Sequence, residues 1–270
     1  MSEQQSLNSL CITQVASTIC DVLGVPAPSQ ADNALPIVKT VAQQSFHQHA
    51  DRVFMYNPDA VALWLYQKYT PLFHDVLKHT QLALPLLSVM PSVTPVCFGS
   101  MYTGVMPVVH GIQSYIKPVI KNETVFDALL KNKKKPCIVS TANDSLSMIF
   151  LEREMDYFIY ETIEECNQKA LALIEEDQYD FILLYNGNFD GTMHRYGPES
   201  TEALAALENN VATFATVAEA IKKHWVNHNT LLGFAPDHGC HRIDGDLGSH
   251  GLEMPEDMNI IHFYGFIPHQ

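Results

Sequence analysis

Short apolar runs alternate with longer stretches of helical periodicity along most of the chain. The continuous apolar runs at 181–185 and 231–235 are typical of strands buried on both faces of a sheet. Between them, apolar residues recur at helical spacing over 200–225 and predict a long amphipathic helix. Because strands alternate with helices, we expect an α/β fold whose mostly parallel central sheet carries helices on both faces. The other expected strands and helices are 53–56, 82–89, 137–140, 157–160 and 260–266 for strands, and 60–69 and 161–176 for helices.

The first fifty residues follow a different pattern. Leu10, Val15 and Ile19 recur at helical spacing, and Gly24 with the prolines after it ends the run. We expect two helices here, which form an N-terminal extension over residues 1–50 that packs on the core of a single domain spanning 1–270. The lysine-rich run at 131–135 predicts an exposed helix end that leads into the next strand.

Composition narrows the classes of partner. Apolar residues make up 47% of the chain, which is enough for a sizeable core. Acidic residues outnumber basic ones by 30 to 16, and a net charge of −14 argues against binding to a nucleic-acid polymer. The six cysteines form no CxxC pair, so we expect a reducing compartment. No signal peptide and no apolar stretch of membrane-spanning length are apparent, and a cytoplasmic protein without a membrane partner is therefore expected.

Residues that can bind metals follow several of the predicted strands. In mostly parallel sheets, ligands bind beyond the carboxyl ends of the strands, so the placement of these residues favours a functional role. Carboxylates and imidazoles together suit zinc or another transition metal. The set is too large for one tetrahedral ion, and two neighbouring ions can clamp an in-line phosphoryl displacement. In chain order the candidates are Asp59, the Thr94 oxygen, Asp190, His194, Asp237, His238 and, in a loop rich in glycine and aspartate, His250.

Each of these elements is common without any ligand. An Asp-His-Gly string is a frequent turn, Thr94 before Pro95 suits a turn hydroxyl, and His250 suits an ordinary loop histidine. His110 is better explained as a histidine whose hydrogen bonds hold a turn. Together, however, the placement of the other candidates at strand ends favours a site.

With these residues in place, the sequence resembles the alkaline phosphatase superfamily, and most closely its type I phosphodiesterase / nucleotide pyrophosphatase branch. Residues 91–112, PSVTPVCFGSMYTGVMPVVHGI, are similar to the nucleophile segment of that branch, with Thr94 at the nucleophile position. The strings DGTMHRYGP, PDHG and GSHG match its three remaining metal motifs in the same order. The resemblance begins near residue 52 and reaches the C-terminus.

The resemblance implies a hydrolase of small phosphoesters that forms a phosphorylated Thr94. It also implies two divalent ions, with zinc as the default and manganese as the alternative. The ligands implied for one ion are Asp190, His194 and His250, and those for the other are Asp59, Asp237, His238 and the Thr94 oxygen.

Two departures from the family pattern bear on the site, and the N-terminal helices before residue 50 are a third departure without an assigned counterpart. The branch usually has glycine after the first aspartate, whereas Ala60 follows Asp59 here. Cys97 stands where the branch often has an asparagine that contacts a phosphate oxygen, and thiols are weaker donors. We expect Cys97 and Arg195, which neighbours His194, to contact substrate. A sulfatase-type role for Cys97 is discounted because the Cys-x-Pro-x-Arg string is missing.

Three alternative functions remain open. A phosphomonoesterase is one, and a phosphate-transferring mutase is another. Mutases of this superfamily normally carry a large cap domain, and the short spacings between the motifs leave no room for one. The third alternative is an inactive metal-binding relative.

Since no Arg or Lys lies between residues 79 and 116, a phosphodiester is expected to be preferred over the dianion of a monoester.

Overall fold

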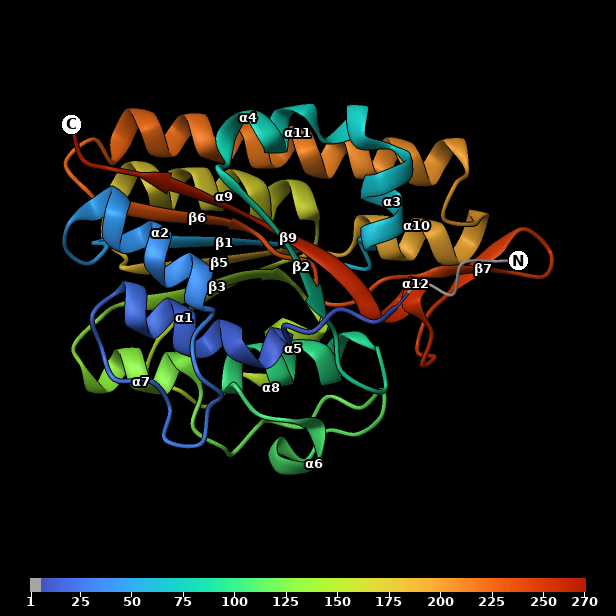
Figure 1. Cartoon of the computed structure of the whole chain (residues 1–270), viewed down its shortest axis with the longest axis horizontal. Helices are drawn as coiled ribbons and strands as arrows, with labels where there is room; N and C mark the ends of the chain where they lie inside the picture. Colours follow the sequence, from blue (N-terminus) through green and yellow to red (C-terminus); the bar gives the residue numbers. More distant parts are fainter. Residues whose placement is uncertain (1–5) are drawn as a thin grey trace.

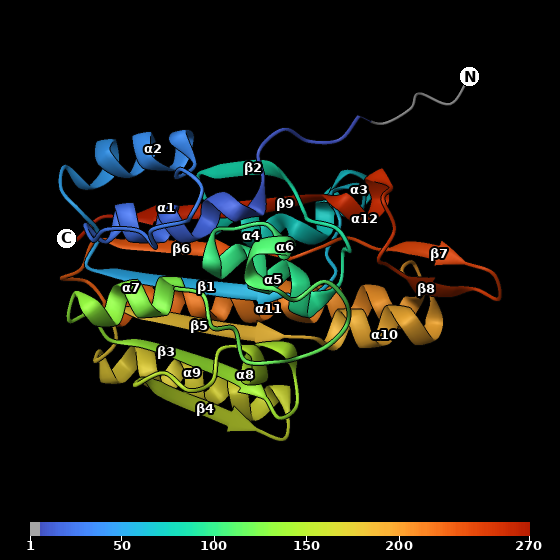
Figure 2. The ribbon, with the colours of Figure 1, turned by 90° about the horizontal axis from the view of Figure 1, so that it is seen from below.

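The computed structural model describes residues 6–270 and contains a seven-stranded central sheet. The strands lie in the order β2-β9-β6-β1-β5-β3-β4 (Figure 2). Only β9 runs against the others, since it pairs antiparallel with both β2 and β6. The mostly parallel sheet is therefore confirmed. Its strands are β1 (Arg52–Pro58), β2 (Leu82–Leu87), β3 (Pro136–Thr141), β4 (Asp156–Tyr160), β5 (Phe181–Asn186), β6 (Thr230–Phe234) and β9 (Asn259–Ile267).

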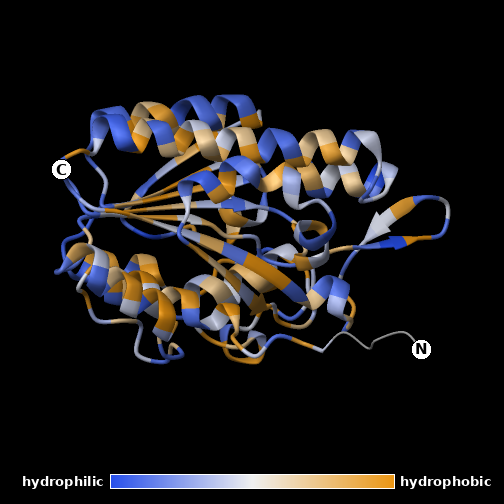
Figure 3. Ribbon diagram, turned by 45° about the horizontal axis from the view of Figure 1, so that its top comes forward, coloured by the Kyte–Doolittle hydropathy of each residue, from blue (hydrophilic) through white to orange (hydrophobic). Residues whose placement is uncertain are grey.

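Both faces of the sheet are buried. Successive side chains of a strand point to opposite faces, so Val53 and Met55 belong to one apolar cluster and Phe54 and Tyr56 to the other. This explains why the central strands read as continuous apolar runs (Figure 3).

Helices cover the sheet in two layers (Figure 1). On the face of Phe54 the layer contains the long helix α11, which begins where the Ser200 hydroxyl accepts a hydrogen bond from the Ala203 amide. The helices of this layer are α3 (Leu63–Lys68), α4 (His74–His79), α9 (Ile163–Glu176) and α11 (Thr201–His224). The opposite layer consists of α1 (Val15–Val22), α2 (Pro36–Phe46), α5 (Thr94–Thr103), α7 (Val125–Lys131) and α8 (Ser145–Ile149).

The N-terminal helices belong to this second layer. Val15 and Ile19 of α1, with Val38 and Phe46 of α2, are buried in the same apolar cluster as helix α5. A short 3-10 helix, η1 (Ile12–Gln14), precedes α1. The described part of the extension therefore packs on the core, whereas the assignment of 1–270 to one domain stays a prediction.

Several short elements were not predicted. The segment expected as a glycine-rich loop contains a small hairpin, β7 (His241–Ile243) and β8 (Leu247–Ser249), which projects beside helix α10 (Asn188–Tyr196) (Figure 1). Helices α4, α5 and α8 were not predicted either, and the other short elements are η2 (Thr70–Phe73), α6 (Pro107–His110) and α12 (Pro255–Met258).

Within residues 6–270, no helix combines the length and the apolar character needed to cross a membrane. The six cysteines are unpaired, and five of them are buried. No large cap is inserted into the described chain, in agreement with the expected core.

Candidate metal centre

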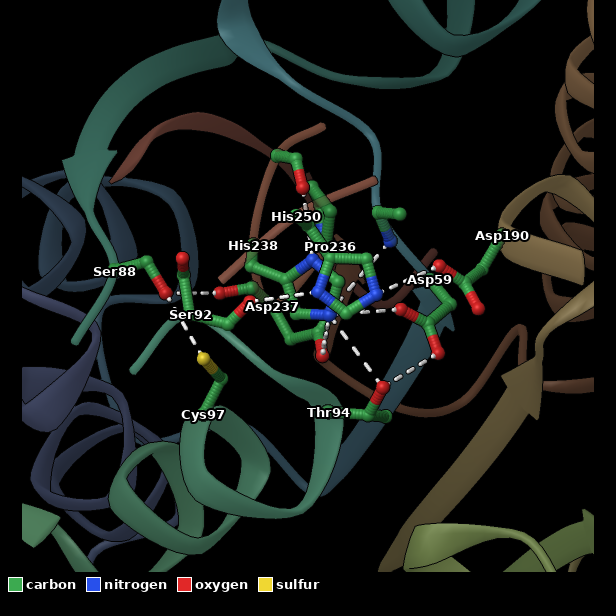
Figure 4. A network of polar contacts seen from close by, with 12 residues as sticks. Asp59, Ser88, Ser92, Thr94, Cys97, Asp190, Pro236, Asp237, His238 and His250 are labelled. Carbon is green, nitrogen blue, oxygen red and sulfur yellow. Dashed lines mark hydrogen bonds and ion pairs between the residues drawn. The ribbon is translucent and has the colours of Figure 1, made fainter. Parts of the chain in front are cut away.

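The predicted site residues converge at the carboxyl ends of the parallel strands (Figure 4). Asp59 directly follows β1, and Thr94 is the first residue of helix α5. Helix α10, which carries Asp190, follows β5, and Asp237 lies shortly after β6. His250 directly follows β8 of the hairpin. Residues up to 191 positions apart in the sequence, from 59 to 250, thus meet at one edge of the sheet.

Four residues form the inner group, in which Asp59, Asp237 and His238 carry the possible metal-binding atoms. The Nε2 atom of His238 lies 3.3 Å from Asp59 Oδ1 and 3.4 Å from Asp237 Oδ2. The Thr94 hydroxyl oxygen lies 3.4 Å from the same Nε2 atom and donates to Asp59 Oδ2 over 3.2 Å. All four side chains are buried.

Asp190, His194 and His250 form the outer group, which is more exposed. Asp190 Oδ1 lies 3.3 Å from the Nε2 atoms of both histidines. These two Nε2 atoms are only 3.0 Å apart. The rings of His238 and His250 stack with their centroids 4.1 Å apart, so the outer group directly adjoins the inner one.

Backbone carbonyls orient all three imidazoles. The Nδ1 atom of His194 lies 3.0 Å from the Gly248 oxygen, that of His238 2.9 Å from the Gly239 oxygen, and that of His250 2.9 Å from the Ser92 oxygen. A carbonyl can only accept, so each ring donates from Nδ1, and a neutral ring then has its lone pair on Nε2. The rings therefore present Nε2 lone pairs to the carboxylates and to each other, which is the arrangement of metal-binding histidines.

The carboxylates show the same need for a cation. Asp59 Oδ1, Asp190 Oδ1 and Asp237 Oδ2 are buried and have no hydrogen-bond partner among the described residues. Buried polar atoms are normally satisfied, and unpaired carboxylate oxygens are costly. Lone pairs of oxygen and nitrogen face one another without a donor between them, so the residues present fit divalent metal ions.

Charge crowding shifts the acid–base behaviour of the groups. Burial, together with the negative charge of Asp190, raises the pKa of Asp59 to about 7. Burial and the charge of Asp59 raise the pKa of Asp237 well above its ordinary value. Burial lowers the pKa of His238 to about 3, so this ring is neutral. Two bound cations would reverse the penalty on the carboxylates, because a metal favours their charged form.

The departure at Ala60 has a backbone explanation. Ala60 has a φ of 64°, in the left-handed region where glycine is usual. Its amide donates to Asp237 Oδ1 over 3.3 Å and so links the loops after β1 and β6. The left-handed backbone turns the chain at this point, and here an alanine accepts the strain of that conformation.

Cys97 and Arg195 are the two residues that the sequence predicts to contact substrate. Cys97 is fully buried, and its sulfur lies 3.2 Å from the Ser88 hydroxyl and faces the Val89 and Pro91 carbonyls. Figure 4 shows it turned away from Thr94. This position argues against the expected contact between Cys97 and substrate. Arg195 is exposed on α10 and lies over the neighbouring Tyr196 ring, with 6.0 Å from its guanidinium carbon to the ring centroid.

His110 holds a turn, as the sequence indicated. Its Nε2 atom lies 3.0 Å from the Ser100 hydroxyl, and its Nδ1 atom accepts a hydrogen bond from the Ile112 amide. Burial lowers the pKa of His110 to about 4, so its ring is neutral. Its contacts within the turn explain this histidine without a role in metal binding.

Sequence reasoning missed two residues beside the site. The Tyr185 hydroxyl donates to Asp59 Oδ2, although Tyr185 had been counted only as part of an apolar strand. Asp257 accepts from the Leu252 amide and lies 2.7 Å from His241 Nδ1, which fastens the segment after His250 to the segment after His238. A tyrosine at the end of a buried strand was a usable signal, whereas no local pattern marked Asp257.

A comparison with protein families agrees with this geometry. A family model described as type I phosphodiesterase / nucleotide pyrophosphatase matches residues 57–147 and 141–261. The chain belongs to this family. The human (Homo sapiens) ectonucleotide pyrophosphatase/phosphodiesterase family member 7 is 34% identical over 81 residues, which are 29% of this chain and 18% of that protein.

Solved structures share the fold. Murine ectonucleotide pyrophosphatase / phosphodiesterase 5, in complex with AMP, has a TM-score of 0.58 at 15% identity, over 72% of this chain and 59% of that one. Phosphonoacetate hydrolase from Sinorhizobium meliloti 1021, in complex with phosphonoformate, has a TM-score of 0.55 at 17% identity, over 70% of this chain and 56% of that one. The chain thus spans less than two thirds of each of these relatives.

Proposed function

We propose that this family member is a metal-dependent hydrolase of small phosphoesters, of the phosphodiesterase / nucleotide pyrophosphatase type. The observation that carries the proposal is the position of the Thr94 hydroxyl. It lies in hydrogen-bonding distance of Asp59 and His238, within a group whose remaining carboxylate oxygens are buried and unpaired.

We assign Asp59, Asp237, His238 and the Thr94 oxygen to one ion, and Asp190, His194 and His250 to the other. Zinc suits the mixture of imidazole nitrogens and carboxylate oxygens, and manganese is the alternative. When bound, such a pair of ions supplies positive charge for the attacking and leaving oxygens of a phosphoryl displacement.

The protein's own groups orient the nucleophile. Asp59 Oδ2 accepts hydrogen bonds from both the Thr94 and the Tyr185 hydroxyls. Its two donors fix the carboxylate, and the fixed carboxylate in turn holds the Thr94 oxygen in place. The Thr94 oxygen then forms the bond to phosphorus and loses its proton, while the bond from phosphorus to the leaving oxygen breaks and that oxygen takes up a proton to depart as an alcohol. Water subsequently hydrolyses the phosphothreonine.

Two measurements test this function. Protein purified without chelator should contain two ions per chain by elemental analysis. The metal-loaded protein should hydrolyse bis(4-nitrophenyl) phosphate with a higher kcat/KM than 4-nitrophenyl phosphate at one pH and metal loading. A protein that binds metal but hydrolyses neither ester would instead support the inactive relative.

The proposed diester preference rests on a shortage of fixed positive charges near Thr94 in the described chain. The described segment from 79 to 116 contains no Arg or Lys. Arg242 is exposed and paired with Asp246, and Arg195 is exposed on α10. A monoester dianion carries one more negative charge than a diester, and these groups offer it no fixed cation. A clear monoester preference would contradict this argument.

A location in a reducing compartment is also a proposal. It rests on the absence of paired cysteines in the described chain. A phosphate-transferring role is less favoured, because no large cap covers the site in residues 6–270.

A further inference from the structure

An open cleft of about 530 Å³ adjoins the metal-ligand candidates at the ends of β1, β3, β4 and β5. We propose that this acidic cleft binds an ester arm that carries a primary or secondary ammonium group. The inference rests on the proposed phosphodiesterase function and assigns a substrate class to it. The lining residues are Asp59, Tyr115, Thr141, Ala142, Asp144, Ser145, Glu161, Ile163, Tyr185, Gly187, Asp190 and Gly191.

The charges of the cleft are one-sided. Four of its lining residues are carboxylates, and the lining contains no lysine, arginine or histidine. Asp59 and Asp190 are metal-ligand candidates, which leaves Asp144 and Glu161 free to face a substrate. In the described chain neither Asp144 nor Glu161 has an ion-pair partner within 4.0 Å. A cation in the cleft would meet attraction from both.

A buried hydroxyl supplies a second, independent indication of a ligand. Ser145 lines the cleft and is only 2% exposed, yet its hydroxyl oxygen has no hydrogen-bond partner in the described chain. A buried polar group without a partner is rare in folded proteins, and a ligand or water bound beside it is one explanation. The hydroxyl can accept from an ammonium N–H, which a quaternary ammonium group does not offer.

Asp144 is held ready for such a group. The Thr141 hydroxyl donates to Asp144 Oδ2 and fixes the orientation of the carboxylate. Burial raises the pKa of Asp144, which shows that its charge is poorly solvated. A poorly solvated carboxylate gains more from a neighbouring cation than a fully hydrated one.

One lysine, Lys117, lies beside the lining residue Tyr115 and does not neutralise the cleft. Lys117 Nζ donates to the Asn143 carbonyl over 2.7 Å, and it lies 5.3 Å from the centroid of the Tyr115 ring. Its charge lowers the pKa of Asp144 but does not outweigh burial. The rim thus already accommodates one ammonium group beside Tyr115, an aromatic residue that is 59% exposed.

The same charges disfavour a second phosphate group. A dinucleotide or nucleoside polyphosphate bound at Thr94 would extend further negative charge from the reacting phosphorus. In this cleft that charge would face Asp144 and Glu161 without a basic residue in the lining. An aminoalkyl arm reverses the sign of the interaction.

A matched pair of esters tests the inference. The substrates are 4-nitrophenyl phosphodiesters whose second arm is either 2-aminoethyl or the neutral, similarly sized propyl group. With the metal-loaded enzyme at pH 7, we expect kcat/KM to be about tenfold higher for the aminoethyl ester, which corresponds to one charge-assisted hydrogen bond. The ratio of the two rates isolates the ammonium group from the chemistry at phosphorus.

Four variants locate the effect. Asp144→Asn and Glu161→Gln should each lower the ratio toward one. Lys117→Gln removes the competing ammonium group and should raise the ratio. Glu175→Gln is the control, because it removes an equal charge from an exposed position near the far end of α9, about 18 Å along the helix from Ile163, and should leave the ratio unchanged.

A binding measurement keeps the test independent of turnover. Calorimetry on metal-loaded Thr94→Ala protein should show the 2-aminoethyl ester of methylphosphonic acid binding about tenfold more tightly than the propyl ester. Hydrolysis of both diesters at equal kcat/KM overturns the cleft inference and leaves the phosphodiesterase proposal standing. If Thr94→Ala protein binds the aminoethyl ester more tightly but metal-loaded wild-type protein hydrolyses neither diester, the cleft inference is supported and the phosphodiesterase proposal is overturned. If the protein neither discriminates between the two esters in binding nor hydrolyses either diester, both proposals are overturned.

Discussion

Replacing Ala60 by glycine should leave the stability of the protein nearly unchanged, although it removes a fully buried methyl group. Ala60 is 0% exposed and has a φ of 64°. An L-residue in the left-handed conformation has a conformational cost of about 1–2 kcal/mol, and glycine avoids this cost. Against this gain, glycine loses about 0.4–1 kcal/mol through the greater freedom of the unfolded chain. The lost methyl group costs about 0.8 kcal/mol more.

These contributions nearly cancel for Ala60→Gly, and the net change lies within about 0.8 kcal/mol of zero. The matched control is Ala235→Gly. Ala235 is also 0% exposed, but its φ is not positive. It therefore loses the same methyl group and gains no relief, so we expect a loss of about 1.2–1.8 kcal/mol.

Urea unfolding of both variants and the wild type, with and without metal, measures the difference. The left-handed strain should appear as a gap of about 1–2 kcal/mol between the two variants. Equal destabilisation by both substitutions would refute the strain argument. It would also remove the explanation for the glycine that the family pattern expects after this aspartate. Metal content, measured in parallel, should be unchanged in Ala60→Gly if the loop keeps its shape.

The remaining predictions concern the metal centre. Thr94→Ala should lose turnover by about 10³-fold or more yet retain both ions, which kinetics and elemental analysis can decide; near-normal turnover would point to a water nucleophile. His250→Ala should empty the outer ion position and Asp237→Ala should disturb the inner one, and anomalous scattering from crystals of each variant would show which peak is lost. In metal-free protein, Asp59→Asn should stabilise the fold more at pH 7 than at pH 5. Burial raises the folded-state pKa of Asp59 to about 7. Between the ordinary pKa of an aspartate and this value, the folded wild type keeps a proton that the unfolded chain has released, so the stability of the wild type falls as the pH rises toward 7. The gap in unfolding free energy should widen by at most about 1.4 kcal/mol per pH unit, and a gap independent of pH would contradict the charge crowding at Asp59.

The sheet could be read from the sequence because its central strands are buried on both faces. The run 181–185 needs no knowledge of its neighbours to be recognised as β5. The direction of β9 could not be read in this way, since its apolar pattern is the same in either orientation. The hairpin β7–β8 was missed despite a usable signal. Asp244-Gly245-Asp246 is a turn sequence, and Gly245 and Asp246 both have positive φ.

The site was predictable as a set of residues but not as an arrangement. Placement after strands selected Asp59, Asp190 and Asp237, because parallel strands bring their carboxyl ends together. The division into two ligand groups came from the family resemblance. It depends on contacts such as the one from His250 Nδ1 to the Ser92 oxygen, which joins positions 158 residues apart. At Cys97, helix α5 carries a thiol where the family often has a polar amide, and the sequence alone did not show that this thiol is buried beside the Ser88 hydroxyl.

The two candidate ligand groups differ in exposure, and this difference predicts the order in which two bound ions would leave. The side chains of Asp59, Asp237 and His238 are at most 1% exposed, whereas that of His194 is 41% exposed. If two ions bind as proposed, chelators would reach the outer one directly past His194, and the inner one only through the cleft that Asp59 lines, past more deeply buried ligands. We therefore expect biphasic demetallation, in which a fast phase removes the ion of the outer group and a slower phase removes the ion of the inner group. Such a protein would retain a half-loaded state for long periods after brief metal starvation, and supplying a single ion would restore it.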